Sequence, residues 1–571
     1  MTAAASITAA TADRAQAAET SGNIASAFVE RAARHPERAA LVLPTDWNDS
    51  AVSAVEQLSY GQLAARTSAW QRQLAGAGLE PGQRVLVLLP ASAELYACAL
   101  AIIASGMTLV LVDAGMSMTR MRAAIDVASP DAMVGEARAR RLARVIPELR
   151  RIRRVVPAES AQSAPAERVG TEELPAVLDR RAEDGAIVSF TSGSTGRPKG
   201  ADRTHGDLLA QHESLTAAFP YLPGDVDMTA WPVLVLHDLL SGMTSVLPPV
   251  RRGALRAVPG DATLGFAIEH GVTLLNGPPA FLAPILDAAK RRHALPALRR
   301  VVTGGGPVYP DLCRSVIAAF PRAEGHVLYG GTEAEPIAHC PMQELIDADH
   351  AGSCGAGAGL LVGPPVPDIE LAVIGTDTPT SSDRSIGDLV VRPGSWGEIA
   401  VCGAHVLSRW FDDPQADRAT RVRSGGDAGR PEFLRTGDIG RVDESGRLWL
   451  GGRVADIVEH EGRPLHPYEV EPVLDRLAGV RRSALMSSPA GGAEVFLDVD
   501  PEAGAEAAAR LARAALPGVG LRGVTVHWPV AIPVDGRHNS KIDRPRLRAR
   551  RARIVAIAAA RRQLVSLRRP R

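Results

Sequence analysis

The stretch from Val85 to Val112 restricts the fold more than any other part of the chain, because it is almost wholly apolar and admits two interpretations. A membrane-spanning helix needs about 20 consecutive apolar residues. Here Pro90 and Gly106 interrupt the stretch, and the carboxylate of Glu94 would be costly in lipid. We therefore reject a membrane span and read the pieces as separate elements of a globular fold.

These pieces predict a strand at 85–89, a helix from about 93 to 104 and a second strand at 109–112. Ser92 is the expected N-cap of the helix, because a serine hydroxyl can accept from the free backbone N–H groups of the first turn. Two short apolar strands joined by a helix are the unit of buried parallel sheets. The sequence thus predicts an α/β fold.

Glycine-rich turns follow four further apolar strands, which we expect at 186–190, 273–275, 300–302 and 326–329. The turns read TSGSTG, NGPPA, TGGGP and GGTEAE. In open α/β sheets, ligands bind beyond the carboxyl ends of the strands. Any one of these turns is explained as a simple tight turn, but four together favour one shared ligand site.

The first of these turns lies in FTSGSTGRPKG, residues 190–200, which combines three glycines with hydroxyl and basic side chains. Such a loop can direct N–H groups, hydroxyls and positive charge at one anion, and phosphate is the obvious candidate. It is not a Walker loop, because Gly200 follows Lys199 where that motif needs Ser or Thr. Taken alone, the stretch is equally compatible with a solvated Ser/Gly turn.

Size and composition set the broad class. A chain of 571 residues exceeds one hydrophobic core, so at least two domains are expected. A net charge of +0 gives no reason to expect nucleic acid as the main partner. The N-terminus lacks the apolar core of a signal peptide, and the five cysteines form no CxxC pair, which favours the cytoplasm. The cysteines are Cys98, Cys313, Cys340, Cys354 and Cys402.

The pattern of elements changes near residue 397. GEIAVCG and GRLWLGG predict strands of a smaller, more antiparallel sheet, and GRVAD at 452–456 looks like a junction. We expect a flexible N-terminus at 1–24, a large multi-sheet α/β domain at 25–452 and a smaller, mobile α+β domain at 453–571, with the active site between the two domains. The arginine-rich C-terminal end is best explained as a solvated helix.

Taken together, five motifs resemble the adenylate-forming superfamily of acyl-CoA synthetases, adenylation domains and luciferases. The resemblance spans roughly residues 25 to 550, and it implies a large N-terminal domain, a small mobile C-terminal domain and an ATP site with Mg²⁺ between them. The motifs, in the order of that family, are FTSGSTGRPKG, TGGGP, YGGTEAE, LRTGDIGRVDESGRLWLGGR and HNSKIDR.

In this resemblance the first motif corresponds to the loop that holds the β- and γ-phosphates of ATP. Adenylation brings two anions together, so the site must neutralise charge and align the reactants. The residues carried over to this loop are Thr191, Ser192, Gly193, Ser194, Thr195, Gly196 and Lys199.

The next two motifs imply the adenine and α-phosphate contacts. Gly304, Gly305 and Gly306 correspond to a slot for the flat base, and Tyr329 with Gly330 to the residues beside adenine. Within the same motif, Thr332 resembles the α-phosphate contact and Glu333 the magnesium ligand. A carboxylate oxygen is a suitable ligand for Mg²⁺; the alternative is that Glu333 is an acid at a helix N-terminus.

The last two motifs imply ribose contacts and a catalytic lysine. Asp438 matches the carboxylate that accepts from both ribose hydroxyls, and Arg453 a second ribose or phosphate contact. Lys541 matches the mobile lysine that stabilises charge in the transition state. The alternative for Lys541 is an ordinary surface lysine.

Three departures from an ordinary acyl-CoA synthetase are present. Val235 stands where that group has a histidine, with His237 two residues later as a neutral core residue. Ala455 replaces the usual hinge residue before Asp456, and Ser540 replaces the glycine before the lysine.

The segments around two of these departures, WPVLVLHDLLSGMTSVLP and PVDGRHNSKIDRPRL, resemble the β-lactone synthetases of olefin and natural-product biosynthesis. That resemblance implies adenylation of a β-hydroxy acid, whose hydroxyl then displaces AMP. Transfer to CoA or a carrier-protein thiol is the alternative, and a non-catalytic nucleotide-binding homologue is a third possibility. Partner biosynthetic enzymes are a further expectation. The acid pocket is expected from 231–243, from 276–280 and from the turn after Glu333, with Trp231, Leu234, Leu236 and Met243 as apolar candidates.

Overall fold

The computed structural model describes residues 22–112, 116–158, 174–191, 198–250, 258–292, 295–350, 358–379, 384–424, 432–500, 504–535 and 541–567. The expected flexible N-terminus lies outside the described residues up to position 21. Asn23 and Ile24 are buried, and the side-chain amide of Asn23 donates to the carbonyl of Ile103 at 2.7 Å. The folded part therefore includes the last residues of the predicted N-terminal segment.

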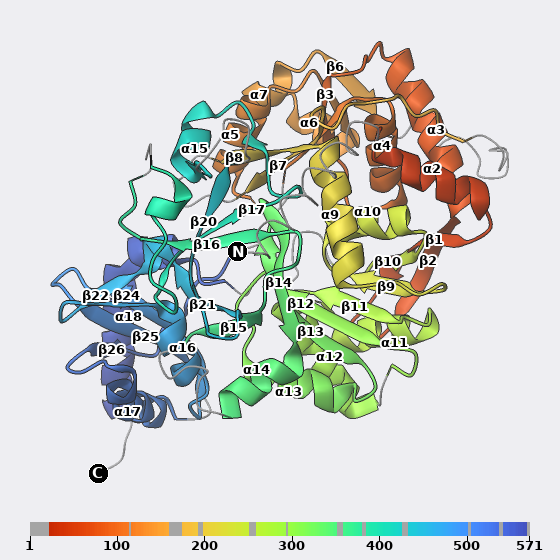
Figure 1. Ribbon diagram of the computed structural model, residues 1–571. Coiled ribbons are helices and arrows are strands. Elements are labelled where there is room, and N and C mark those ends of the chain that lie inside the picture. Colours follow the sequence, from red (N-terminus) through yellow and green to blue (C-terminus); the bar gives the residue numbers. More distant parts are fainter. Residues whose placement is uncertain are drawn as a thin grey trace.

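One seven-stranded sheet contains the predicted strand–helix–strand unit (Figure 1). Its order is β18-β8-β7-β4-β3-β5-β6, with parallel pairing from β7 to β6 and antiparallel pairing of β8 with both of its neighbours. The strands are β3 (Arg84–Leu88), β4 (Thr108–Leu111), β5 (Ala132–Gly135), β6 (Arg154–Pro157), β7 (Gly185–Thr191), β8 (Lys199–Thr204) and β18 (Arg409–Trp410).

The helix of this unit, α4 (Ala93–Ala104), confirms the reading of the apolar stretch. The hydroxyl of Ser92 accepts from the N–H of Leu95 at 3.3 Å, as an N-cap should. Nearly every residue of α4 is buried, which explains its apolar character without lipid. Across the described parts of the chain, no helix has the length and apolar composition needed to cross a membrane.

The second sheet has eight strands in the order β14-β13-β12-β11-β9-β10-β1-β2. Pairing is parallel from β1 through β10, β9, β11 and β12 to β13, and antiparallel at the two outer strands. The strands are β1 (Ala39–Trp47), β2 (Val52–Ser59), β9 (Val226–Thr229), β10 (Thr244–Val246), β11 (Leu274–Gly277), β12 (Arg300–Gly304), β13 (Glu324–Gly331) and β14 (Ala334–Pro341).

The third sheet is antiparallel, as the change of pattern near residue 397 predicts. Both predicted strands belong to it. Its strands are β15 (Leu360–Gly363), β16 (Glu370–Ile374), β17 (Gly397–Cys402), β19 (Arg421–Val422), β20 (Phe433–Val442) and β21 (Leu448–Arg453).

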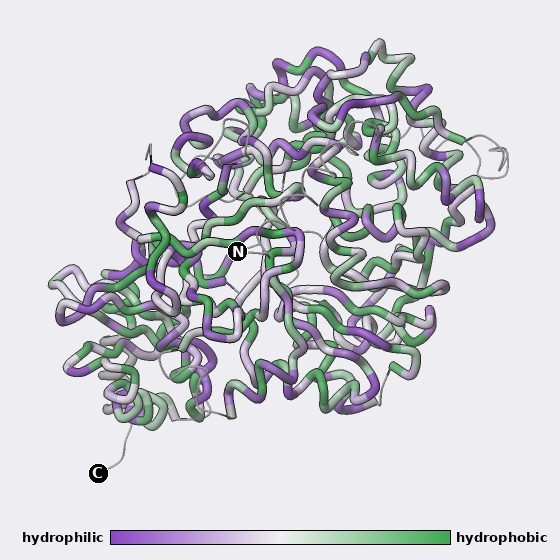
Figure 2. Tube along the Cα trace, in the orientation of Figure 1, coloured by the Kyte–Doolittle hydropathy of each residue, from purple (hydrophilic) through white to green (hydrophobic). Residues whose placement is uncertain are grey.

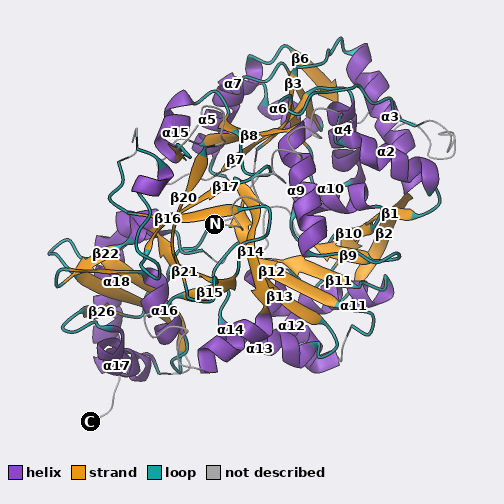
Figure 3. Cartoon of the chain, viewed as in Figure 1, coloured by secondary structure: helices purple, strands orange, loops and turns teal. Residues whose placement is uncertain are grey.

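Helices lie around these sheets, with the strands toward the inside (Figure 3). Apolar stretches follow the strands, whereas hydrophilic stretches line the upper edge of the view in Figure 2. Helices α3 (Tyr60–Gly76) and α9 (His205–Ala218) each begin with a capping box, at Ser59 with Gln62 and at Thr204 with Asp207.

Besides α3, α4 and α9, the helices before residue 421 are α2 (Ala25–Arg34), α5 (Met118–Ala128), α6 (Ala137–Leu142), α7 (Pro147–Arg150), α10 (Pro232–Ser241), α11 (Gly260–Glu269), α12 (Pro279–Arg292), α13 (Pro310–Ala319), α14 (Met342–His350), α15 (Pro414–Thr420) and the short 3₁₀ helix η3 (Ile386–Asp388).

The C-terminal part, blue in Figure 1, has apolar clusters of its own. One of them contains buried residues from 458 to 528 alone, and a second joins β24 and β25 to α18. The predicted boundary between residues 452 and 453 stays a prediction. The elements are η4 (Val454–Asp456), β22 (Val458–His460), β23 (Arg463–Leu465), α16 (Pro467–Asp475), β24 (Val480–Ser487), β25 (Ala493–Val499), α17 (Ala505–Ala515), η5 (Leu516–Val519), β26 (Thr525–His527) and α18 (Arg544–Leu567).

Candidate active site

Three of the four predicted glycine-rich turns follow neighbouring parallel strands of the eight-stranded sheet. Asn276 of β11 pairs with Val302 of β12, and Val302 pairs with His326 of β13. Parallel strands end at the same edge of a sheet, so these turns lie along one edge. The fourth strand, β7, belongs to the seven-stranded sheet and not to the sheet of the other three.

The turn after β12 has two positions that only glycine fits easily. A Cβ added at Gly304 would lie 2.2 Å from the carbonyl oxygen of Leu328, and Gly305 has a φ of +71°. The turn is therefore flat and free of side chains where it passes β13. This shape suits the adenine slot that the resemblance implies for Gly304, Gly305 and Gly306, which stays a prediction.

Thr332 and Glu333 form the turn between the antiparallel strands β13 and β14, where Gly331 pairs with Ala334. Glu333 is thus not an acid at a helix N-terminus, and that alternative is wrong. Both turn residues are half-buried. The carbonyl of Glu333 accepts from the N–H of Leu407 at 2.7 Å, which anchors the turn to the segment before β18. Just before the turn, a Cβ at Gly330 would lie 2.9 Å from the carbonyl oxygen of Ala334.

Asp438 is held between two of the other predicted site residues. The hydroxyl of Tyr329 donates to its Oδ2 at 2.9 Å, and the Nε of Arg453 lies 2.8 Å from its Oδ1. The positions of Asp438 and Arg453 are paired directly across β20 and β21. Each carboxylate oxygen can accept two hydrogen bonds, so one position on each oxygen is left for a ligand.

Tyr329 is buried, whereas the Arg453 side chain is about half exposed at 49%. Burial, reinforced by Asp438, raises the pKa of Tyr329 well above its ordinary value. The phenol therefore keeps its proton at any physiological pH and donates it to Asp438. Tyr329 is predicted beside adenine, and this hydrogen bond ties it to the predicted ribose contact as well.

Lys541 reaches the same place from the other end of the chain. Two hydrogen bonds join Asp535 and Lys541. The N–H of Asp535 donates to the carbonyl of Lys541 at 2.9 Å, and the N–H of Lys541 donates to Asp535 Oδ1 at 3.0 Å. Burial and the charge of Arg453 lower the pKa of the Lys541 ammonium, while Asp438, Asp535 and Glu333 oppose this shift. The lysine is thus within electrostatic reach of both predicted nucleotide carboxylates.

The phosphate loop connects two paired strands. Thr191, at the end of β7, pairs with Lys199, at the start of β8. The Lys199 ammonium lies 5.3 Å from the centre of the Trp410 ring, a cation–π distance. The predicted contacts Ser192, Gly193, Ser194, Thr195 and Gly196 lie outside the described residues.

The two positions that depart from acyl-CoA synthetases on the acid side are both buried in α10. Val235 packs in an apolar cluster with α4 and α3. The Nδ1 atoms of His237 and His212 are 2.8 Å apart. Burial, helped by His212, lowers the pKa of His237 well below its ordinary value, so the ring is neutral, as expected for a core residue. Of the predicted acid-pocket residues, Leu234 and Met243 are buried.

Sequence reasoning missed Arg203 and the segment from His405 to Phe411. Arg203 is buried in β8 and donates to the carbonyl of Thr332 at 2.8 Å. The available signal was the position of Arg203 in a strand whose other side chains are mostly buried. An arginine buried in such a strand needs hydrogen-bonding partners inside the protein.

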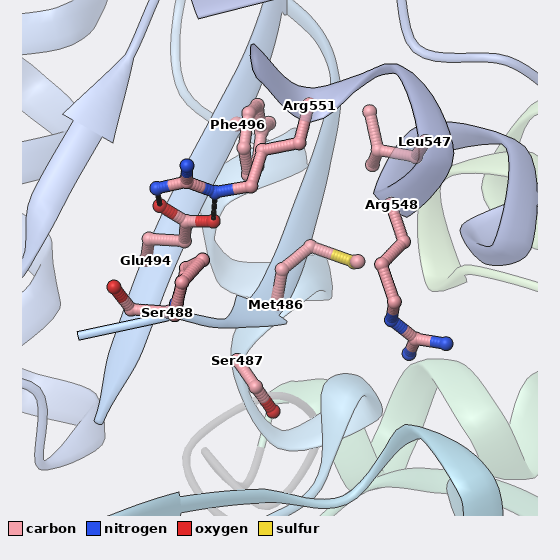
Figure 4. A pocket seen from close by; sticks show the side chains of 9 residues that line it. Met486, Ser487, Ser488, Glu494, Phe496, Leu547, Arg548 and Arg551 are labelled. Carbon is pink, nitrogen blue, oxygen red and sulfur yellow. Dashed lines mark hydrogen bonds and ion pairs between the residues drawn. The ribbon is translucent and has the colours of Figure 1, made fainter. Parts of the chain in front are cut away.

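A separate hollow of about 290 Å³ lies in the C-terminal part, between β24, β25 and α18. Figure 4 shows the Arg551 guanidinium bound to the Glu494 carboxylate on one wall, with Met486, Phe496 and Leu547 on the others. None of the residues lining it belongs to the predicted nucleotide site. This hollow therefore contributes nothing to the candidate site.

The donor set suits a magnesium nucleotide. Among the described residues, no group of three or more His, Cys, Asp or Glu side chains is arranged to hold a metal ion. Magnesium on a nucleotide needs only one or two carboxylates, because phosphates and water supply the other ligands. A single half-buried carboxylate at Glu333, beside a turn without side chains at Gly304, is compatible with that arrangement.

Comparison with known proteins identifies the family. Residues 28–409 match the family described as AMP-binding enzyme, which covers more than half of the chain. The chain belongs to the AMP-binding enzyme family. It is an AMP-forming, adenylate-forming ligase, and a non-catalytic homologue is no longer a reasonable interpretation.

Two curated relatives match almost end to end. The olefin β-lactone synthetase of Stenotrophomonas maltophilia is 35% identical over 92% of this chain and 97% of its own length. The olefin β-lactone synthetase of Xanthomonas campestris is 32% identical over 92% and 96%. The resemblance to β-lactone synthetases seen in the motifs is therefore confirmed.

Solved structures of the superfamily share the fold. O-succinylbenzoate coenzyme A synthetase from Bacillus subtilis, in complex with AMP, superposes with a TM-score of 0.72 at 20% identity, covering 92% of this chain and 98% of that one. Amide bond synthetase McbA from Marinactinospora thermotolerans gives 0.71 at 23% identity, covering 92% and 99%. The expected α/β fold with two-domain architecture is confirmed.

Proposed function

We propose that this AMP-forming ligase activates a β-hydroxy acid with ATP and then closes it to a β-lactone. The observation that carries the proposal is that Lys541 lies close enough to Asp438, Arg453 and Glu333 for their charges to act on it, although these residues come from distant parts of the chain. A binding protein would gain nothing from a lysine delivered by a late, separate loop. The near end-to-end likeness to two olefin β-lactone synthetases supports the choice of product.

In the first step a carboxylate oxygen of the acid attacks the α-phosphorus of ATP, and pyrophosphate leaves. Lys199 and the loop before it would hold the β- and γ-phosphates, Thr332 the α-phosphate and Asp438 the ribose hydroxyls. Lys541 would neutralise charge that builds between the acyl and phosphate oxygens, which is where a preorganised cation lowers the barrier most. Magnesium, held by Glu333, would supply charge neutralisation on the phosphates.

In the second step the substrate's own hydroxyl oxygen attacks the acyl carbon. The bond from that carbon to the AMP oxygen breaks, the hydroxyl proton is released, and a four-membered lactone and AMP are formed. No thiol is consumed. Because the nucleophile is tethered to the carbonyl it attacks, the site need only fold the chain and exclude water from the mixed anhydride.

The alternative is transfer of the acyl group to CoA or to a carrier-protein thiol. It shares the first step, so the two functions differ only in the acceptor. The departures at Val235 and Ser540 favour the lactone, since both lie in segments that resemble the β-lactone synthetases. Partner biosynthetic enzymes, a cytoplasmic location and a domain boundary at 452/453 complete the proposal.

The test is product analysis by mass spectrometry with ATP and magnesium and a panel of acids. Each β-hydroxy acid is paired with the acid of the same length that lacks the hydroxyl, and each reaction is run with and without CoA. The proposal expects a product 18 Da lighter than the β-hydroxy acid, together with AMP and without a thiol. Turnover only when a thiol is supplied would establish the alternative.

A further inference from the structure

Arg203 is a charged side chain in an unusual place for a strand of the seven-stranded sheet. It lies in β8, the strand that leaves the phosphate loop, and only 4% of its surface is exposed. Burying a guanidinium is costly unless its N–H groups are bound. Its contacts therefore show which parts of the protein the arginine joins.

The guanidinium binds acceptors from three other segments. Its Nη1 donates to the carbonyl of Thr332 at 2.8 Å. Its Nη2 lies 3.1 Å from Gln211 Oε1, 3.3 Å from the carbonyl of Asp207 and 3.4 Å from the carbonyl of His405. The strand after the phosphate loop, helix α9, the segment before β18 and the Thr332–Glu333 turn are thus joined at one side chain.

The segment from His405 to Phe411 holds the same turn and strand from the other side. The N–H of Leu407 donates to the carbonyl of Glu333 at 2.7 Å, and the N–H of Phe411 donates to the carbonyl of Gly200 at 2.7 Å. The hydroxyl of Ser408 donates to Asp207 at 3.2 Å. Both carbonyls of the Thr332–Glu333 turn are therefore held, one by Arg203 and one by this segment.

We propose that Arg203 is a positioning residue that sets the place of Thr332 and Glu333 relative to the phosphate-binding strand. The inference rests on the proposed function, because it assumes that Thr332 contacts the α-phosphate and that Glu333 holds magnesium. The reacting phosphorus lies between groups carried by two sheets, β7–β8 in one and β13–β14 in the other. Arg203 provides a direct bond between these sheets at that point.

The charge of Arg203 is accompanied by nearby acidic groups. Burial lowers the pKa of its guanidinium, and Asp207, Glu335 and Glu333 act in the opposite direction. The hydrogen bond to the Thr332 carbonyl at 2.8 Å holds the turn that carries Glu333, so loss of Arg203 should displace this turn and weaken the use of magnesium by the site.

A purely structural role is the competing explanation. In that case loss of Arg203 would lower stability and the fraction of folded enzyme, but the folded fraction would use ATP and magnesium normally. The two roles therefore predict different effects of magnesium on the affinity for ATP. This effect is independent of the amount of folded protein, and it can be measured without turnover.

The experiment is calorimetric titration of ATP into the full chain, with and without magnesium and without any acid. The variants are Arg203→Met, which removes the charge and the donors, and Arg203→Lys, which keeps the charge with fewer donors. Arg481→Gln is the control, since Arg481 pairs with Asp498 at 2.6 Å between β24 and β25, is exposed and lies outside the segments that Arg203 joins.

Magnesium should strengthen ATP binding in the wild type, and Arg203→Met should reduce this strengthening about tenfold. Misplacement by about 1 Å can cost up to about 100-fold in rate, so pyrophosphate exchange should fall about 10- to 100-fold. Arg203→Lys should lie between the two, and Arg481→Gln should match the wild type. Should Arg203→Met be too unstable to titrate, the Arg203→Lys protein decides alone.

An unchanged magnesium effect in Arg203→Met or Arg203→Lys would overturn the inference. A wild type that binds ATP with magnesium yet exchanges no pyrophosphate with any acid would overturn the proposed function instead. Failure of the folded wild type to bind ATP at all would overturn both.

Discussion

At the scale of single residues, the site depends on side chains that are held by others before any ligand arrives. The Asp438 carboxylate is fixed by Tyr329 and Arg453, and the backbone of Lys541 is fixed by Asp535. Preorganised charge is effective in catalysis because it needs no rearrangement during the reaction. Each of these residues can therefore be tested separately.

Lys541→Ala should leave ATP binding nearly unchanged while slowing acyl-adenylate formation about 10²- to 10³-fold, the cost of removing one preorganised charge. The measurement is exchange of labelled pyrophosphate into ATP, beside a direct ATP titration. Lys290→Ala is the control, because Lys290 is exposed on α12 and pairs only with Asp287. Undiminished exchange by the Lys541 variant would contradict the catalytic role.

Gly304→Ala should weaken ATP binding at least about tenfold, because the added Cβ would lie 2.2 Å from the Leu328 carbonyl oxygen and the turn would have to move. Gly265→Ala, in helix α11, serves as the control, since an added Cβ there meets nothing within 4 Å. Equal ATP affinity of the two variants would show that the turn after β12 is not part of the nucleotide site.

At the scale of elements, helix α10 is joined to the eight-stranded sheet by two fully buried carboxyl groups. Asp227 of β9 lies beside Asp238 of α10, and both have 0% exposure. Asn276 donates to Asp227 at 2.7 Å and Ser245 to Asp238 at 2.7 Å. Burial is the main cause that raises the pKa of Asp227 to about 7 and that of Asp238 well above its usual value.

This pair makes stability depend on pH. In the unfolded chain both carboxyls lose their protons near pH 4. The folded protein keeps the proton of Asp227 up to about pH 7, and the pKa of Asp238 is also raised well above its usual value. The folded state binds more protons in this window, so stability falls as pH rises, by about 1.4 kcal/mol per pH unit for each proton kept. The other charged and titratable groups acting on the pair are Tyr60, Tyr96, Tyr221, Asp225 and Arg300.

Asp227→Asn should remove the contribution of about one proton from the slope of unfolding free energy against pH between about pH 4.5 and 7. The measurement is urea unfolding at several pH values. Asp46→Asn, an exposed residue of β1 in the same sheet, should keep the wild-type slope. An Asp227→Asn protein that keeps the wild-type slope would contradict the protonated pair.

Much at this scale could be predicted from the sequence. Apolar runs with clear breaks predict β3, α4 and β4, because period, length and capping by Ser92 all agree. Which strands share a sheet could not be predicted, since sheet order depends on contacts between distant segments. Accordingly, the glycine-rich turns alone do not show that β7 lies in another sheet than β11, β12 and β13.

Within the site, the family motifs identify residues that bind one another, such as Tyr329, Asp438 and Arg453. Arg203 has no such motif. Its role depends on which carbonyls surround it after folding, and backbone carbonyls leave no trace in sequence.

At the scale of the whole molecule, the C-terminal part is joined to the rest through Asp349 of α14. Arg476, which follows α16, lies 2.6 Å from its Oδ1, and Arg314 of α13 binds its other oxygen. Tyr309, next to α13, is half-buried close to Asp475 and Tyr468. These contacts hold the part that carries Lys541 against helices α13 and α14.

Asp349→Asn should lower pyrophosphate exchange about fivefold, roughly 1 kcal/mol, because the partly exposed Arg476 loses its ion pair and the contact between the two parts weakens. Hydrogen exchange of α16 and β24 should increase at the same time. Asp287→Asn, which removes an exposed pair within α12, is the control. If Asp349→Asn keeps the wild-type rates of pyrophosphate exchange and of hydrogen exchange, the ion pair of Asp349 with Arg476 does not contribute to the contact between the two parts.

The pairing of β7 with β8 also has a consequence for how the triphosphate is held. The chain enters the predicted phosphate loop from β7 and leaves it into β8, the antiparallel neighbour of β7. Thr191 pairs with Lys199 across these two strands. In Walker-type loops the following helix points its positive dipole end at the phosphates, but here β8 takes that place. In the proposed function the attraction would therefore come from Lys199, which is half-buried, and from the N–H groups and hydroxyls of the loop. Salt screens such charges, so ATP affinity should fall with ionic strength.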